Sequence, residues 1–218
     1  MKIRRFDEVT GIGVEAIAGQ KRFGFSVSDT EDFYDMPEWQ KRGGYPGTAL
    51  RFYDHESGKV FCPFAKKRNV LYGKPIYAEG KFYFLQGDFD RNQITLYRYL
   101  PGEASENITT FSVDAVNLYN LMLMGQGVHV VSKDDSLVCY YPEKFEIPLQ
   151  STETPVWIEE NRIYIEAWVE EGWDTEKDQP GSDHRFYNRV CIKDFSGRTL
   201  SEEIGALHQA EDGTWWIA

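Results

Sequence analysis

The feature that most constrains the fold of this chain is a hairpin pattern that recurs five times. Each occurrence is an apolar strand, a tight polar turn and a second apolar strand. The turns lie at residues 19–21, 79–81, 125–127, 160–162 and 212–213. Aromatic and β-branched runs separated by Gly, Asn or Asp turns are typical of antiparallel β-structure. The recurrence therefore predicts an all-β repeat protein.

The spacing of the hairpins indicates the size of the repeat. The first apolar residues after the five turns lie 59, 46, 35 and 52 residues apart, at Phe23, Phe82, Val128, Ile163 and Trp215. A four-stranded β-propeller blade takes about 40–50 residues. We therefore expect residues 1–218 to form a single β-propeller-like domain of five blades. An open array of antiparallel sheets is the alternative.

The hydrophobic pattern within each repeat favours sheets packed face to face. Apolar residues fill consecutive positions in the first hairpins, as in residues 82–85 and 128–131, so both faces of these strands must be covered. Later strands alternate apolar and polar residues, as in residues 95–99 and 189–193. Such strands place one face toward water. This gradient is expected of inner and outer strands around an axis.

The last hairpin resembles a known repeat. Residues 204–217 read Ile-Gly-Ala-Leu-His-Gln-Ala-Glu-Asp-Gly-Thr-Trp-Trp-Ile, with an apolar strand, an Asp-Gly turn and a Trp followed by Ile. This pattern resembles the propeller repeat of bacterial two-component-regulator sensor domains. The resemblance covers about fourteen residues. It implies a β-propeller fold and assigns no function.

The two ends of the chain suggest how such a ring closes. No second hairpin follows residue 217, whereas residues 2–9 form a strand-like segment without a blade of their own. An unpaired edge strand invites aggregation, and propellers avoid it by completing the last blade with the other terminus. We therefore expect the N-terminal strand, residues 1–9, to pair with the last hairpin.

Two segments have helical features. Residues 37–42 follow Asp35, a helix-capping residue type, and precede a Gly-Gly pair that ends helices, so a short helix is expected there. Residues 114–122 are expected to form a linker and a strand. A helix capped by Asp114 is the alternative, since apolar residues recur there at helical spacing.

Charge and cysteine content exclude several partners. The net charge of −11, with residues 66–68 the only basic run, predicts no nucleic-acid or membrane binding. Asp7 and Glu8 interrupt the N-terminus before a signal-peptide core, so a cytoplasmic location is expected. Cys62, Cys139 and Cys191 lie in apolar strand contexts without a Cys-x-x-Cys pair. They are predicted to be reduced, buried thiols, with no metal or cofactor.

Two long segments carry the candidate binding residues. Residues 29–47 and 170–185 are both expected to be loops between second and third strands, which project on one face of a propeller. Their aromatic side chains lie among many acids, an arrangement that can stack on sugars or anchor a protein. The candidate ligand-binding residues are Tyr34, Trp39, Tyr45, Trp173, Asp174 and His184. The alternative is that these aromatic residues pack the loops onto the domain.

The sequence thus favours a non-catalytic binding module for an unknown protein or glycan, without a catalytic residue assigned. A carbohydrate-active glycoside hydrolase is the alternative, since two suitably spaced carboxylates suffice for that chemistry. Its candidate acids are Asp29, Asp32, Asp35, Glu166, Glu170 and Asp174. A structural or sensory subunit of a larger assembly is a third possibility.

Overall fold

Antiparallel strands dominate the computed structural model, which describes residues 2–218 and is 49% strand and 6% helical. Within these residues the strands form four successive sheets and a final hairpin, and each sheet is open. All five predicted hairpins are present. The all-β prediction is confirmed.

The first two sheets follow the order of the chain. The first contains β1 (Glu15–Ala16), β2 (Phe23–Val27), β3 (Leu50–Asp54) and β4 (Val60–Phe61). The second contains β5 (Val70–Tyr72), β6 (Ile76–Ala78), β7 (Lys81–Asp88), β8 (Gln93–Tyr99) and β9 (Glu106–Ser112). Because β5 and β6 both pair with β7, the first strand of this sheet is split in two.

The remaining strands repeat the same order. The third sheet contains β10 (Met122–Met124), β11 (His129–Lys133), β12 (Ser136–Tyr141) and β13 (Phe145–Pro148). The fourth contains β14 (Glu153–Glu159), β15 (Arg162–Asp174), β16 (Gln179–Lys193) and β17 (Thr199–Ile204). The final hairpin contains β18 (Leu207–Gln209) and β19 (Trp215–Ile217).

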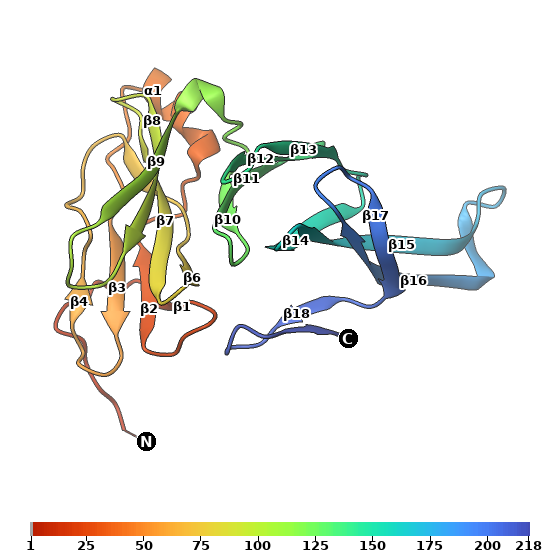
Figure 1. Ribbon diagram of the computed structural model, residues 1–218, viewed down its shortest axis with the longest axis horizontal. Helices are drawn as coiled ribbons and strands as arrows, with labels where there is room; N and C mark the ends of the chain where they lie inside the picture. The colour runs from red at the N-terminus through yellow and green to blue at the C-terminus, as the bar shows by residue number, and fades with distance from the viewer. Residues whose placement is uncertain (1) are drawn as a thin grey trace.

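The sheets succeed one another along an arc (Figure 1). The first and second sheets lie side by side, and the third sheet lies between the second and the fourth. The β18–β19 hairpin turns back toward the first sheet. There the two hairpin turns meet: the Gly19 amide donates to the Glu211 carbonyl at 3.4 Å. The turn of the last hairpin therefore contacts the turn of the first.

Neighbouring sheets pack through separate hydrophobic clusters. The first and second sheets share an aromatic cluster that includes Phe25, Phe52, Phe82 and Phe84. The second and third sheets share a mainly aliphatic cluster, and the third and fourth share another. Residues 82–85 and 128–131 are buried throughout, as the consecutive apolar pattern predicts.

Residues 6–8 contact the first sheet, so the predicted pairing of the N-terminal segment with the last hairpin is wrong for residues 2–9; Met1 lies outside the described part. They form no strand. The Asp7 amide donates to the Gly58 carbonyl at 2.9 Å, and its carboxylate accepts from the Val60 amide at 2.9 Å. Glu8 pairs with Arg51 at 2.8 Å. These contacts hold Asp7 and Glu8 against β3, β4 and the turn between them.

The structure confirms the short helix predicted at residues 37–42 and the linker and strand predicted at residues 114–122. A 3₁₀ turn η1 (Phe33–Asp35) leads into α1 (Met36–Lys41), which ends before the Gly-Gly pair. Residues 114–122 form no α-helix: a short turn η2 (Val113–Ala115) is followed by irregular chain and then by β10.

Of the three cysteines, which are all free, Cys139 and Cys191 are buried as expected, but Cys62 is exposed. Cys62 follows an outermost strand, β4, and no further strand within residues 2–218 pairs with the free side of β4.

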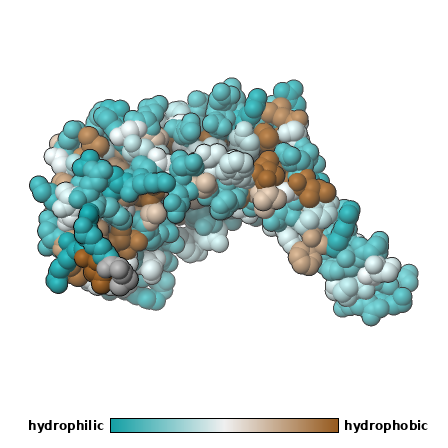
Figure 2. All heavy atoms as spheres, turned by 90° about the horizontal axis from the view of Figure 1, so that it is seen from below, coloured by the Kyte–Doolittle hydropathy of each residue, from teal (hydrophilic) through white to brown (hydrophobic). Residues whose placement is uncertain are grey.

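The segment predicted as a second loop, residues 170–185, is instead the end of a long hairpin. Strands β15 and β16 continue through most of it and pair up to Asp174 and Gln179. This arm projects from the fourth sheet, away from α1 at the other end of the molecule (Figure 1). The two segments are therefore not side by side, because regular strand pairing carries residues 170–185 outward. Seen from below, the arm is mostly hydrophilic, with hydrophobic atoms gathered at its base (Figure 2).

A buried histidine makes stability depend on pH. His129, at the start of β11, is almost fully buried; its Nδ1 has no partner within residues 2–218, and its Nε2 lies 3.5 Å from Glu143. Burial lowers the pKa of His129 below its ordinary 6.5, although Glu143 opposes this. The unfolded chain therefore takes up the proton first, and His129 lowers stability as pH falls below about 6.5.

We expect the His129→Asn variant to show a smaller fall in melting temperature between pH 8 and pH 5.5 than the original chain. The other three histidines are common to both proteins, so the difference between the two falls isolates His129. Thermal unfolding followed by circular dichroism at both pH values measures it. Equal falls in the two proteins would show that His129 does not titrate differently on folding.

Candidate functional site

An apolar cavity of ≈ 310 Å³ opens between the second and third sheets, beneath the η1 turn. Its walls come from three places in the chain: Phe33 of η1, strands β5 to β7, and the crossover that leads into β10. The aliphatic wall residues are Leu71, Ile76, Leu85, Leu118, Leu121 and Leu123. Phe33 fits there because Gly73 and Gly87 face it; a Cβ on Gly87 would lie 2.9 Å from its ring.

Two exposed tyrosines stand beside this cavity. Tyr34 and Tyr119 are 61% and 43% exposed and pack edge to face, with ring centroids 5.3 Å apart. Their chain neighbours Phe33 and Leu118 line the cavity, so the ring pair joins its two sides. Exposed aromatic pairs of this kind offer a large contact area at a small cost in side-chain entropy.

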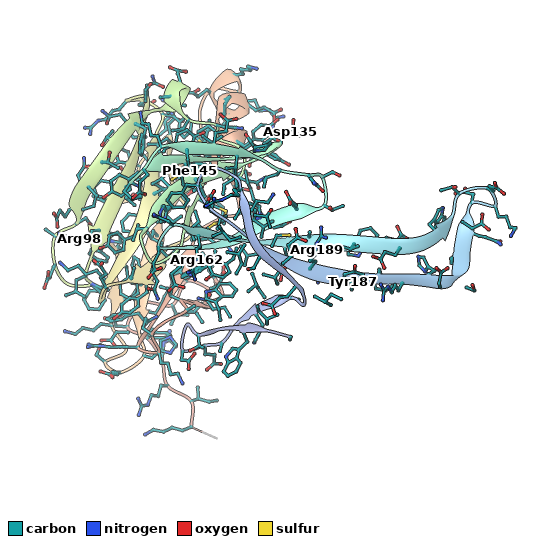
Figure 3. The ribbon with its side chains drawn as sticks, turned by 45° about the vertical axis from the view of Figure 1, so that its right-hand side comes forward. Arg98, Asp135, Phe145, Arg162, Tyr187 and Arg189 are labelled. Atoms are coloured by element: carbon teal, nitrogen blue, oxygen red, sulfur yellow. The ribbon has the colours of Figure 1, made fainter. Side chains whose placement is uncertain are left out.

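A polar depression of ≈ 350 Å³ adjoins the cavity, and Asn120 lines both. The side-chain Nδ2 of Asn120 donates to the Lys133 carbonyl at 3.0 Å, which ties the crossover to the end of β11. Charged and polar residues line the depression: Lys133, Asp134, Asp135, Gln150, Ser151, Glu153 and Thr154. Asp135 lies on the same side of the molecule as α1 (Figure 3). We call the apolar cavity and the polar depression together the crossover groove.

A buried ion pair supports the polar half of the groove. Lys193 Nζ lies 2.8 and 3.0 Å from the two carboxylate oxygens of Glu153, and both side chains are largely buried. Glu153 also accepts a hydrogen bond from the Gln150 amide at 3.0 Å. The pair therefore fixes the chain segment that forms this wall, since breaking a buried pair leaves an uncompensated charge.

The first predicted segment contributes one exposed residue and two that hold the segment in place. Tyr45 is buried, and its hydroxyl bonds Asp29 and Thr48; burial, with help from Asp29, raises its pKa well above the ordinary value. Trp39 packs on Tyr45 and donates from Nε1 to Glu31 at 2.7 Å. Of the three candidates in this segment, Tyr34 alone is exposed.

The second group of predicted residues lies on the arm. Trp173 is exposed and its ring lies 5.9 Å from that of His184, whose Nε2 is 2.9 Å from Glu170. Asp174 accepts from the Glu176 and Lys177 amides at 3.1 Å and pairs with Lys177, which lowers its pKa. Because the arm points away from α1, the structure does not bring this group to Tyr34 (Figure 1).

Five of the six acids considered for a hydrolase form hydrogen bonds or ion pairs with neighbouring residues, whereas the sixth, Asp32, is exposed at the rim of the apolar cavity. Asp29 accepts from Tyr45, and Asp35 accepts from the Asp32 amide at 2.8 Å. Glu166 accepts from the Leu207 amide, which joins the fourth sheet to the last hairpin. Glu170 and Asp174 are paired on the arm. These contacts give each of the five carboxylates a structural role.

Comparison with family models, with curated proteins and with solved structures finds no match. Within the described residues no group of three or more His, Cys, Asp or Glu side chains is arranged to hold a metal ion. No helix among residues 2–218 is long and apolar enough to cross a membrane.

Proposed function

We propose that this chain is a five-bladed, β-propeller-like binding module without catalytic activity. Four successive antiparallel sheets that pack face to face support this interpretation, as does a fifth hairpin whose turn returns to the first sheet. Its three free cysteines agree with a reducing compartment, and we propose the cytoplasm.

The module binds a segment of a partner protein in the crossover groove. The observation that carries this proposal is the composition of the groove: an aliphatic cavity beside a polar depression, with the exposed pair Tyr34 and Tyr119 next to the cavity. An aliphatic cavity suits a large apolar side chain, and buried anchors of this kind dominate binding energy at protein interfaces. A sugar ring would leave its hydroxyl groups unpaired against such walls, so a glycan fits less well.

The charge of the groove favours basic residues in the bound segment. Glu31, Asp32, Asp134 and Asp135 line it, against Lys74 and Lys133. The chain as a whole carries a net charge of −11, which steers a cationic partner toward it. The expected ligand is therefore a peptide segment with one large apolar side chain flanked by Lys or Arg.

A peptide selection tests this function. Panning a random peptide display library against the immobilised chain should enrich sequences of that type, and fluorescence polarisation measures their affinity. The double variant Tyr34→Ala/Tyr119→Ala should weaken binding about thirtyfold, because the loss of each exposed ring removes an interface contact worth about 1 kcal/mol. An unchanged melting temperature confirms that the fold is intact.

The matched control is Phe186→Ala, which removes a comparably exposed ring from the arm, 68% exposed, and should leave the affinity unchanged. Three outcomes would contradict the proposal: no enrichment of peptides, equal binding by the tyrosine variant, or binding in a glycan array in place of peptides. Hydrolysis of a glycoside by the chain would favour the alternative enzyme function.

A further inference from the structure

A second cavity, of ≈ 340 Å³, lies between the fourth sheet and the last hairpin. Its side chains come from β14, β15, β18 and β19, with Gln126 of the β10–β11 turn at one side. It shares no lining residue with the crossover groove. Three of its walls are aromatic: Trp157, Tyr164 and Trp215.

Strand pairing brings these groups together. Trp157 and Glu159 are two residues apart on β14, so they lie on the same face of the strand. Tyr164 is the direct partner of Trp157 across the β14–β15 ladder. From the last hairpin, the ring of Trp215 packs against Trp157, with centroids 5.3 Å apart and the planes inclined at 48°. The two indole rings thus form a corner, with the phenol beside it.

The charge at this corner is unbalanced. Glu159 is half-buried and lines the cavity, yet no Lys or Arg within residues 2–218 lies within 4.0 Å of its carboxylate. In the same part of the chain no cation lies over the rings of Trp157, Tyr164 or Trp215. The Nε1 of Trp215 is buried and has no acceptor there. The cavity therefore offers aromatic faces and a negative charge that no described cation neutralises.

We propose that this cavity binds a quaternary or methylated ammonium group. The faces of tryptophan and tyrosine attract such a cation through their quadrupoles, and the attraction is greatest when the cation is easily desolvated. A simple ammonium group needs several hydrogen-bond acceptors, whereas a methylated one needs a nonpolar surface with a nearby negative charge. Glu159 supplies that charge.

Titration with tetramethylammonium chloride tests the site directly. Binding is followed through the tryptophan indole signals in ¹H–¹⁵N spectra, with sodium chloride at equal ionic strength as the reference. We expect the indole signals of Trp157 and Trp215, assigned from single Trp→Phe variants, to shift saturably with tetramethylammonium alone. Neopentyl alcohol, a neutral molecule of similar shape, should bind about tenfold more weakly because it lacks the charge.

Glu159→Gln is the decisive variant, because it removes the charge and keeps the rings. We expect it to weaken tetramethylammonium binding by about threefold to tenfold. Glu79→Gln is the matched control: Glu79 lies in the turn of the corresponding hairpin in the second sheet and outside this cavity. Loss of the same net charge there should leave the affinity unchanged.

Two further ligands distinguish the source of the ammonium group. Tighter binding of a trimethyllysine peptide than of choline identifies a methylated protein, and the reverse order identifies a small quaternary amine; both support the proposal. The absence of a saturable shift, equal affinity for neopentyl alcohol, or an unchanged affinity in Glu159→Gln would overturn it.

Discussion

Replacing Phe84 with alanine is expected to lower the free energy of unfolding by about 3–5 kcal/mol, because it empties the centre of the aromatic cluster between the first two sheets. Phe84 is fully buried. Its ring lies 5.8 Å from that of Tyr97, 6.0 Å from that of Tyr72 and 6.2 Å from that of Phe52. Since Phe52 belongs to β3 and Phe84 to β7, the cavity would loosen the contact between two sheets.

Urea unfolding followed by tryptophan fluorescence and by circular dichroism measures this loss. Phe84→Leu keeps most of the apolar volume and should lose clearly less. Phe186→Ala removes a phenylalanine that is 68% exposed on the arm and should change the free energy by no more than about 0.5 kcal/mol. A loss in Phe84→Ala that equals the loss in Phe186→Ala would show that the cluster does not carry the contact.

Local chemistry explains why the repeat was predictable from the sequence. A tight turn needs residues that accept positive φ, and Glu79, Gly80, Gly125, Glu160 and Gly213 adopt it here. A strand covered on both sides needs an unbroken apolar run. Both requirements are met within a few residues, so each hairpin is visible in the sequence without knowledge of its neighbours.

The sequence does not predict the arm, because the arm has neither a short tight-turn signature nor an unbroken apolar run. Residues 170–185 contain many acids, two glycines and a proline, which are typical of a loop. The strands persist through cross-strand pairs, such as Glu171 with Arg185 at 2.6 Å. Because water covers both faces of this ladder, it has no apolar period that a sequence pattern can reveal.

The crossover groove was only partly predictable for a different reason. The sequence indicates Tyr34 because it lies in an aromatic, acidic segment, but its partner Tyr119 lies in a crossover whose sequence predicts only a linker. The two tyrosines are brought together by the packing of the second sheet on the third. That long-range contact depends on the whole core and leaves no local signature near residue 119.

The contact between the third and fourth sheets gives a prediction of similar size. Gly125, with φ at 79°, lies in the β10–β11 turn and presses on β14: a Cβ there would be 2.1 Å from the Ile158 carbonyl oxygen. The Gly125→Ala variant therefore has two costs: alanine is strained at positive φ, and its Cβ forces the turn to move away from β14. We expect a loss of about 3–5 kcal/mol in the free energy of unfolding, measured by urea unfolding.

Gly80 separates the two costs. It has φ at 78° in the equivalent turn of the second sheet, and a Cβ there would meet no atom within 4 Å. Gly80→Ala therefore bears the backbone cost alone, about 1–2 kcal/mol. The excess loss in Gly125→Ala over Gly80→Ala measures how tightly the third sheet is seated on the fourth. Equal losses of unfolding free energy in the two variants would mean that the turn moves away from Ile158 at no cost. The third and fourth sheets would then be held together by side-chain packing, without this backbone contact.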